Sequence, residues 1–201
     1  NDVVATYIAG VKWDALPAAV QRRALLCMLD GVGAMLAGSL TPIARISAGY
    51  VSAAWPGRST IALSGLTAGA AGAAFANGNA ANALDIDDDA IFTRGHPGAQ
   101  LVPATLALGE QVGASGKSVL EALVVGYEVA IRTGRCWHAL HTDYQSCGSW
   151  GSVACAAAAA HLLRLEIPEI RHALGIAEYH APNAPMMRAI AAPSMVKHAI
   201  G

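Results

Sequence analysis

Two polar stretches of the 201-residue chain hold most of the side chains that could do chemistry. The first begins with Asp85-Ile86-Asp87-Asp88-Asp89, where four of the eight aspartates in the chain fall within five positions. Such crowded carboxylates repel one another unless a cation, a histidine or a shared proton relieves the repulsion. Arg94 and His96 close the same stretch, so it is a candidate site of charge-dependent chemistry. The composition leaves open a solvated acidic loop that caps the next helix.

The second polar stretch, residues 138–148, lies directly before an alanine-rich segment that reads as a helix. It contains His138, His141 and Cys147. Free backbone N–H groups at a helix start favour a carboxylate or another anion, and a histidine there can move a proton near neutral pH. Together the two stretches favour general acid–base chemistry on a small anion. A helix-entry loop with surface histidines is the alternative, and Cys147 lacks a visible activating partner for a role as nucleophile.

The other histidines have simpler interpretations. His161 and His172 lie within helical patterns and are expected to be structural, while His180 stands at a helix end and stays undecided. The sequence has no P-loop, G-x-G-x-x-G or H-E-x-x-H motif.

Composition excludes several classes of protein. Hydrophobic residues make up 54% of the chain and charged residues only 13%, whereas disorder requires low hydrophobicity and high net charge. Thirteen basic residues against 14 acidic ones give no cationic surface for nucleic acid. Four cysteines without C-x-x-C spacing predict reduced thiols in a cytoplasmic protein. No membrane span is expected, since the apolar run 25–40 contains Asp30 and the alanine-rich run 152–160 ends at His161.

Helical periodicity dominates the elements that must position these loops. A capping box of Ser118 and Glu121 is expected to open one helix, and the only strand-like piece, 59–64, looks isolated. The segment 68–84 consists mainly of Ala, Gly and Asn, so we expect a central helix that is approached closely from several sides. The fold class is therefore all-α, a helical bundle with long loops. The predicted helices cover about residues 4–11, 17–38, from 42 on, 68–84, 99–112, 118–131, 149–165 and from 168 on, followed by a proline-rich loop over 181–193.

Several motifs in this order resemble the MmgE/PrpD family. They are Asn82-Ala83-Leu84-Asp85-Ile86-Asp87-Asp88, His96-Pro97-Gly98, Leu101-Val102-Pro103-Ala104, Gly126-Tyr127-Glu128-Val129-Ala130 and Gly148-Ser149-Trp150-Gly151, with Leu29-Asp30-Gly31-Val32-Gly33 and Leu36-Ala37-Gly38 earlier. The family includes 2-methylcitrate dehydratase, cis-aconitate decarboxylase and iminodisuccinate epimerase. All three activities weaken a bond at a carbon next to a carboxylate.

The resemblance implies a large all-helical domain and a smaller α+β domain in a homodimer, working without metal or organic cofactor. Residues 1–201 would then be the helical domain, itself incomplete, with the α+β domain missing from this chain. The implied substrate is a small di- or tricarboxylate.

The resemblance also implies the site. The family's catalytic residues match Asp85, His96, His141 and Lys197 in this sequence. On that basis His96 and His141 form the acid–base pair, Asp85 holds one of them, and Lys197 binds a substrate carboxylate.

Three more residues are expected to contact substrate: Asp89, Arg94 and His180. Decarboxylase-like members carry Thr where this chain has Asp89, and the loop from Asp85 to His96 is one residue longer here. Both departures count against a cis-aconitate-type substrate, so a dehydratase acting like 2-methylcitrate dehydratase is the activity we favour.

Two other functions remain as alternatives. An aspartate-rich motif at a helix end also suits Mg²⁺ holding a diphosphate, although no second acidic motif is visible on another helix. A helical interaction module without enzyme activity is the other alternative.

Overall fold

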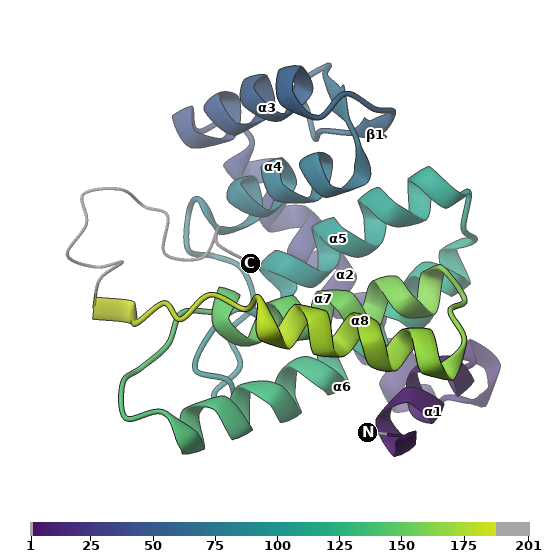
Figure 1. Cartoon of the computed structure of the whole chain (residues 1–201). Helices are drawn as coiled ribbons and strands as arrows, with labels where there is room; N and C mark the ends of the chain where they lie inside the picture. Colours follow the sequence, from purple (N-terminus) through teal and green to yellow (C-terminus); the bar gives the residue numbers. More distant parts are fainter. Residues whose placement is uncertain (1, 188–201) are drawn as a thin grey trace.

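The computed structural model describes residues 2–187, which form a bundle of helices with one small hairpin (Figure 1). The all-α prediction is confirmed. The elements are α1 (Asp2–Gly10), a 3-10 turn η1 (Trp13–Ala15), α2 (Ala18–Gly38), α3 (Pro42–Ala54), β1 (Ser59–Thr60), β2 (Thr67–Ala68), α4 (Ala70–Asn82), α5 (Pro97–Val112), α6 (Gly116–Leu140), α7 (Gly148–Leu162) and α8 (Ile167–Tyr179). Lys197 lies outside the described residues.

The expected isolated strand 59–64 is wrong, because its strand covers only Ser59–Thr60 and is one half of a hairpin. Ser59 pairs with Ala68 and Thr60 with Thr67 in antiparallel register. The chain reverses through Leu63 and Gly65, both with positive φ, a conformation that glycine adopts at no steric cost. The second strand is only two residues long, Thr67–Ala68, which is too short to show an alternating pattern.

The start of α6 also differs from the prediction. Its N-cap is Ser115, whose hydroxyl accepts a hydrogen bond from the Ser118 backbone N–H at 3.2 Å. Ser118 and Glu121 therefore do not form a capping box. The Glu121 carboxylate is engaged elsewhere, since its Oε1 accepts from the Trp13 backbone N–H at 2.6 Å.

Small residues make α4 a central helix, as predicted. It packs against α2, α3 and α5, and seven of its 13 residues are buried. The closest approach is to α2, where a Cβ added at Gly38 would lie 1.8 Å from the Ala80 carbonyl oxygen. The main hydrophobic core lies on the other side, among α5, α6 and α7, with Leu101, Leu123 and Trp150 fully buried.

His161 fastens the N-terminal segment to this core, which confirms its structural interpretation. Its Nδ1 lies 2.7 Å from the Ile8 carbonyl oxygen, and its Nε2 lies 3.4 Å from Glu121 Oε2. With the bond from Trp13 to Glu121, these contacts join α1, η1, α6 and α7. We call this group the His161–Glu121 knot.

Replacing His161 with leucine is expected to lower the free energy of unfolding by about 1–3 kcal/mol, because the Ile8 carbonyl and the Glu121 carboxylate lose a buried partner. Urea unfolding followed by circular dichroism measures the loss. His172→Leu, at an exposed position on α8, is the control and should stay within about 0.5 kcal/mol of the parent protein. Equal stability of the two variants would contradict the structural role.

Within residues 2–187, no single helix is both long and apolar enough to cross a membrane. The pair α2 and α3 passes on length and composition, but the two helices are bent by 94°.

Candidate active site

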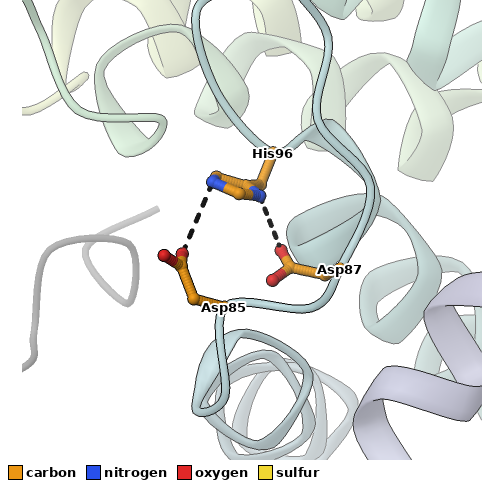
Figure 2. Close-up of side chains that lie close together, drawn as sticks. All are labelled: Asp85, Asp87 and His96. Carbon is orange, nitrogen blue, oxygen red and sulfur yellow. Dashed lines mark ion pairs between the residues drawn. The ribbon is translucent and has the colours of Figure 1, made fainter.

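A charged cluster of three residues lies on the connection between α4 and α5. Figure 2 shows the His96 ring between the carboxylates of Asp85 and Asp87. His96 Nε2 lies 3.6 Å from Asp85 Oδ1, and His96 Nδ1 lies 3.2 Å from Asp87 Oδ2. The side chain of Asp87 is fully buried, while Asp85 is half exposed. The ring therefore has one carboxylate on its inner side and one toward solvent.

The local sequence explains this arrangement. Helix α4 ends at Asn82, and Asp85 then adopts a left-handed conformation with φ of 57°. Such a backbone is uncommon for residues other than glycine, and aspartate tolerates it better than most. The amide of Asn82 reaches back to the loop, donating from Nδ2 to both oxygens of Asp87 at 3.1 Å. The Asn82 amide thus fixes the Asp87 carboxylate at the position where it contacts His96.

These neighbours determine the charge of His96. Its contact with Asp87 and the charges of Asp87 and Asp85 raise the pKa of His96 from 6.5 to about 9, although burial works in the opposite direction. At neutral pH the ring is therefore an imidazolium, a group able to donate a proton.

The raised pKa of His96 gives a pH dependence with a definite sign. A pKa of 6.5 when unfolded and about 9 when folded means that the stabilisation is fully present below pH 6.5. It is then lost as the pH rises through 9. The urea midpoint of the parent protein minus that of His96→Gln should therefore shrink from pH 6 to pH 9.5. A difference that stays constant, or grows, over this range would contradict the ion pairs.

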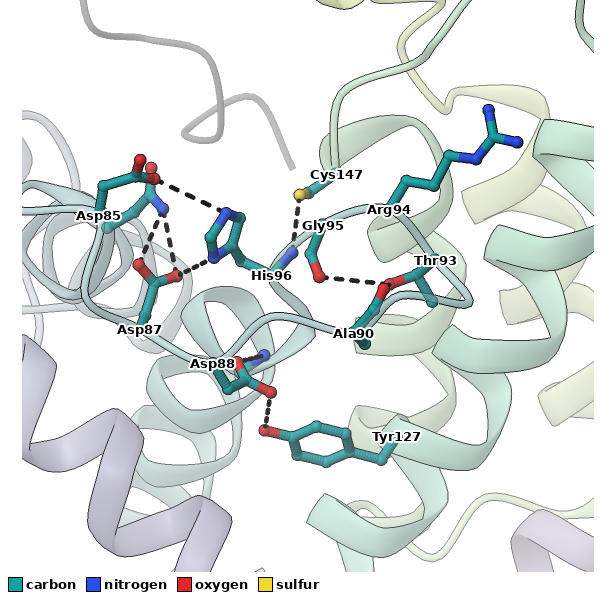
Figure 3. Close-up of polar contacts among 12 residues, drawn as sticks. Asp85, Asp87, Asp88, Ala90, Thr93, Arg94, Gly95, His96, Tyr127 and Cys147 are labelled. Carbon is teal, nitrogen blue, oxygen red and sulfur yellow. Dashed lines mark hydrogen bonds and ion pairs between the residues drawn. The ribbon is translucent and has the colours of Figure 1, made fainter.

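The second polar loop packs against the far end of the first (Figure 3). The Tyr144 hydroxyl donates to the Arg94 carbonyl, and the His96 backbone N–H donates to Cys147 Sγ at 3.1 Å. Only glycine fits at position 95, where the two loops meet, because a Cβ at Gly95 would lie 2.4 Å from Cys147 Sγ. Burial raises the pKa of Cys147 to about 12, so its thiol is neutral at pH 7 and does not provide a thiolate nucleophile.

Of the residues expected to act, the described contacts bring together Asp85 and His96. His141 is exposed at the end of α6, where its ring stacks on Trp137 with centroids 5.2 Å apart. Arg94 is exposed, and its side chain points away from His96 in Figure 3.

The described contacts join neither of the other two expected substrate residues to the cluster of Asp85, Asp87 and His96. His180 is exposed at the end of α8, edge-on to Tyr179. Asp89 is exposed and lines, with Asp30 and Asp88, a hollow of about 520 Å³ beside α2. The roles assigned to His141, Arg94, Asp89, His180 and Lys197 remain predictions.

Sequence reasoning missed the partner that dominates the charge of His96. Asp87 was recognised as part of the acidic run, but not as the buried residue that contacts the ring. The available signal was Asn82, a polar side chain at the end of an otherwise apolar helix and able to reach the loop.

A divalent cation is the other group that this cluster could hold, since ligand atoms of Asp85, Asp87 and His96 lie within 4.8 Å of one another. Metal binding requires a neutral imidazole, and the pKa of about 9 at His96 opposes that form at neutral pH. Without a bound cation, the cluster is an imidazolium held by two carboxylates.

Comparison with known proteins identifies the fold family. The model of the MmgE/PrpD N-terminal domain matches residues 2–201, nearly the whole chain. The chain belongs to the MmgE/PrpD family. The helical bundle described above is therefore the N-terminal domain of that family, as the motifs in the sequence indicated.

Curated MmgE/PrpD relatives include enzymes with a named reaction. The chain is 32% identical to cis-aconitate decarboxylase of Homo sapiens, covering 92% of this chain and 40% of the relative. It is 31% identical to the cis-aconitate decarboxylase-like protein oryM of Aspergillus oryzae, covering 85% and 38%. Cis-aconitate decarboxylase of Aspergillus terreus is 30% identical, with coverage of 82% and 35%. The chain thus spans about two fifths of the length of these relatives.

Proposed function

We propose that this MmgE/PrpD chain is part of a lyase that works by acid–base chemistry at a carbon next to a carboxylate, on a small di- or tricarboxylate. One observation carries the proposal: His96 is held as an imidazolium between Asp85 and Asp87. An imidazolium in this position supplies a proton, and the two carboxylates hold its ring in place. The chemistry needs no organic cofactor.

Both lyase reactions of this class, dehydration and decarboxylation, use the proton of His96. In dehydration, a base removes the C–H proton next to the carboxylate, the C–O bond breaks, and His96 protonates the departing hydroxyl to give water. In decarboxylation, the C–C bond breaks to release CO₂, the electron pair is delocalised into the remaining carboxylate system, and His96 protonates the carbon. Dehydration needs a separate base, for which His141 is the candidate. Lys197 and Arg94 are the candidates for binding substrate carboxylates.

Two considerations point to different substrates. Asp89 and the longer loop favour dehydration of a 2-methylcitrate-like substrate, whereas the names of the relatives favour decarboxylation of cis-aconitate. Epimerisation next to a carboxylate is the third candidate reaction, and it would make the enzyme an isomerase rather than a lyase. We expect the enzyme to act as a homodimer, which light scattering of the intact protein tests.

The deciding experiment is proton NMR in D₂O of the full-length protein with 2-methylcitrate, citrate, cis-aconitate and iminodisuccinate. A new vinyl signal from citrate, or loss of the C–H signal of 2-methylcitrate with its methyl doublet becoming a singlet, identifies dehydration. A decarboxylated alkene from cis-aconitate identifies a carboxy-lyase. Exchange of a C–H signal for deuterium without a new product identifies epimerase-type chemistry. A folded protein that leaves the whole panel unchanged would overturn the proposal, and turnover only of a prenyl diphosphate with Mg²⁺ would support the diphosphate alternative.

A further inference from the structure

Asp88 turns its side chain away from the His96 ring, to the opposite side of the loop from Asp87 (Figure 3). Its Oδ1 accepts a hydrogen bond from the Gly98 backbone N–H at 2.7 Å, and its Oδ2 accepts one from the Tyr127 hydroxyl at 2.9 Å. Gly98 lies in the first turn of α5, and Tyr127 lies in the middle of α6. One carboxylate thus joins the acidic run to two helices.

The spacing of these contacts matters for the ion pair. Asp88 directly follows Asp87, and Gly98 comes two residues after His96. The bond from Gly98 to Asp88 therefore closes the loop just behind the two residues that form the ion pair. With both ends of the loop fixed, Asp87 and His96 have little freedom to move apart.

The contact leaves no room for another side chain. A Cβ added at Gly98 would lie 2.3 Å from Asp88 Oδ1 and 2.7 Å from the Tyr127 hydroxyl oxygen. The first turn of α5 thus approaches the carboxylate through bare backbone, and its positive helix end favours a negative group at this position.

We propose that Asp88 is a positioning residue, which keeps Asp87 against His96 by tying the acidic run to the start of α5 and to Tyr127. The role in turnover rests on the proposed function, whereas the effect on the His96 ring does not. Asp88 has no contact with the substrate in this assignment.

Burial raises the pKa of Asp88, while the hydrogen bonds from Tyr127 and Gly98 act in the opposite direction and favour the carboxylate. The titratable and charged groups around it are Tyr127 from α6, Arg23, Cys27 and Asp30 from α2, and its neighbours Asp87 and Asp89. Burial, followed by the charge of Asp88, raises the pKa of Tyr127, so the phenol keeps the proton that it donates.

The test compares three variants of the full-length protein. Asp88→Ala removes both contacts, whereas Asp88→Asn keeps an oxygen for Gly98 and an amide that can donate to the Tyr127 hydroxyl. Asp14→Asn, at an exposed ion pair with Lys117 on another surface, is the matched control. NMR titration of the His96 ring reads its surroundings directly, and steady-state kinetics give kcat and KM.

For Asp88→Ala, we expect the pKa of His96 to fall from about 9 toward 6.5. We also expect kcat to fall about 10²-fold, the effect of a displacement of about 1 Å at a reacting group, with a smaller change in KM. Asp88→Asn should restore most of the titration and of kcat, and Asp14→Asn should match the parent protein. Should Asp88→Ala fail to fold, Tyr127→Phe, which removes only one contact, should lower both quantities partway.

A folded Asp88→Ala with an unchanged titration of His96 would overturn the positioning role, whatever its activity. Failure of the proposed function gives a different result, in which the titration still shifts but the parent protein turns over none of the carboxylates.

Discussion

Exchanging His96 for glutamine should lower kcat about 10²–10⁴-fold, the usual contribution of a positioned general acid or base. Glutamine is similar in size and keeps hydrogen-bonding groups near Asp85 and Asp87. It carries no positive charge and has no proton to give at neutral pH. The loss should therefore fall mainly on kcat, because the acid acts as a bond breaks. A smaller change in KM is expected, because Lys197 and Arg94 are the candidates that bind the substrate carboxylates.

Steady-state assays with the substrate found by NMR measure this loss, with His172→Gln as the matched control. His172 is an exposed histidine on α8 that belongs to neither polar loop, so the control should keep full activity. Circular dichroism checks that both variants fold. A folded His96→Gln enzyme within twofold of the parent kcat would remove His96 from the chemistry.

Truncating Trp150 should produce the largest loss of stability, about 3–5 kcal/mol for Trp150→Ala. This indole is fully buried in the core among α5, α6 and α7. It also lies under the loop from Asp85 to His96, since its Cζ2 is 3.4 Å from the position of a Cβ on Gly95. The alanine variant would leave a cavity directly beneath the backbone that carries His96.

Trp150→Phe separates the loss of volume from the loss of the indole N–H. Within residues 2–187 the buried Trp150 Nε1 has no hydrogen-bond partner, so phenylalanine removes a polar atom whose burial is unfavourable. Phenylalanine should therefore cost much less than alanine, and urea unfolding measures both variants. Equal losses of stability in the two variants would show that stability depends on the indole itself rather than on the volume that the side chain fills.

The long helices could be predicted because each carries a repeated apolar pattern. Proline at the first turn marked the starts of α3 and α8, at Pro42 and Pro168. The N-cap of α6 was missed because two serines compete, and a local motif does not show that Glu121 is used by Trp13 and His161. The hairpin was missed because its second strand has only two residues. This strand pairs with the first one because the turn between the two strands brings them together.

The site shows the same limit more sharply. The acidic run and His96 could be recognised by their types and their resemblance to the family, but the direction of each aspartate could not. Asp85 breaks the helical course with its positive φ, and after that neither a helical nor a strand period applies. The different roles of Asp85, Asp87 and Asp88 depend on the contacts of Asn82 and Tyr127, which lie on different helices.

The His161–Glu121 knot and the loop of the His96 cluster contact α6 at different places. The knot uses Glu121, whereas the loop meets the helix at Tyr127 through Asp88 and at Gly134 through Thr93, about 9 Å and 20 Å further along at 1.5 Å per residue. Free-energy changes at sites this far apart usually add. Substitutions around the His161–Glu121 knot can therefore add a reserve of stability without altering the chemistry at His96. That reserve would let the loop from Asp85 to His96 accept costly substitutions, so new substrate preferences can arise while the fold persists.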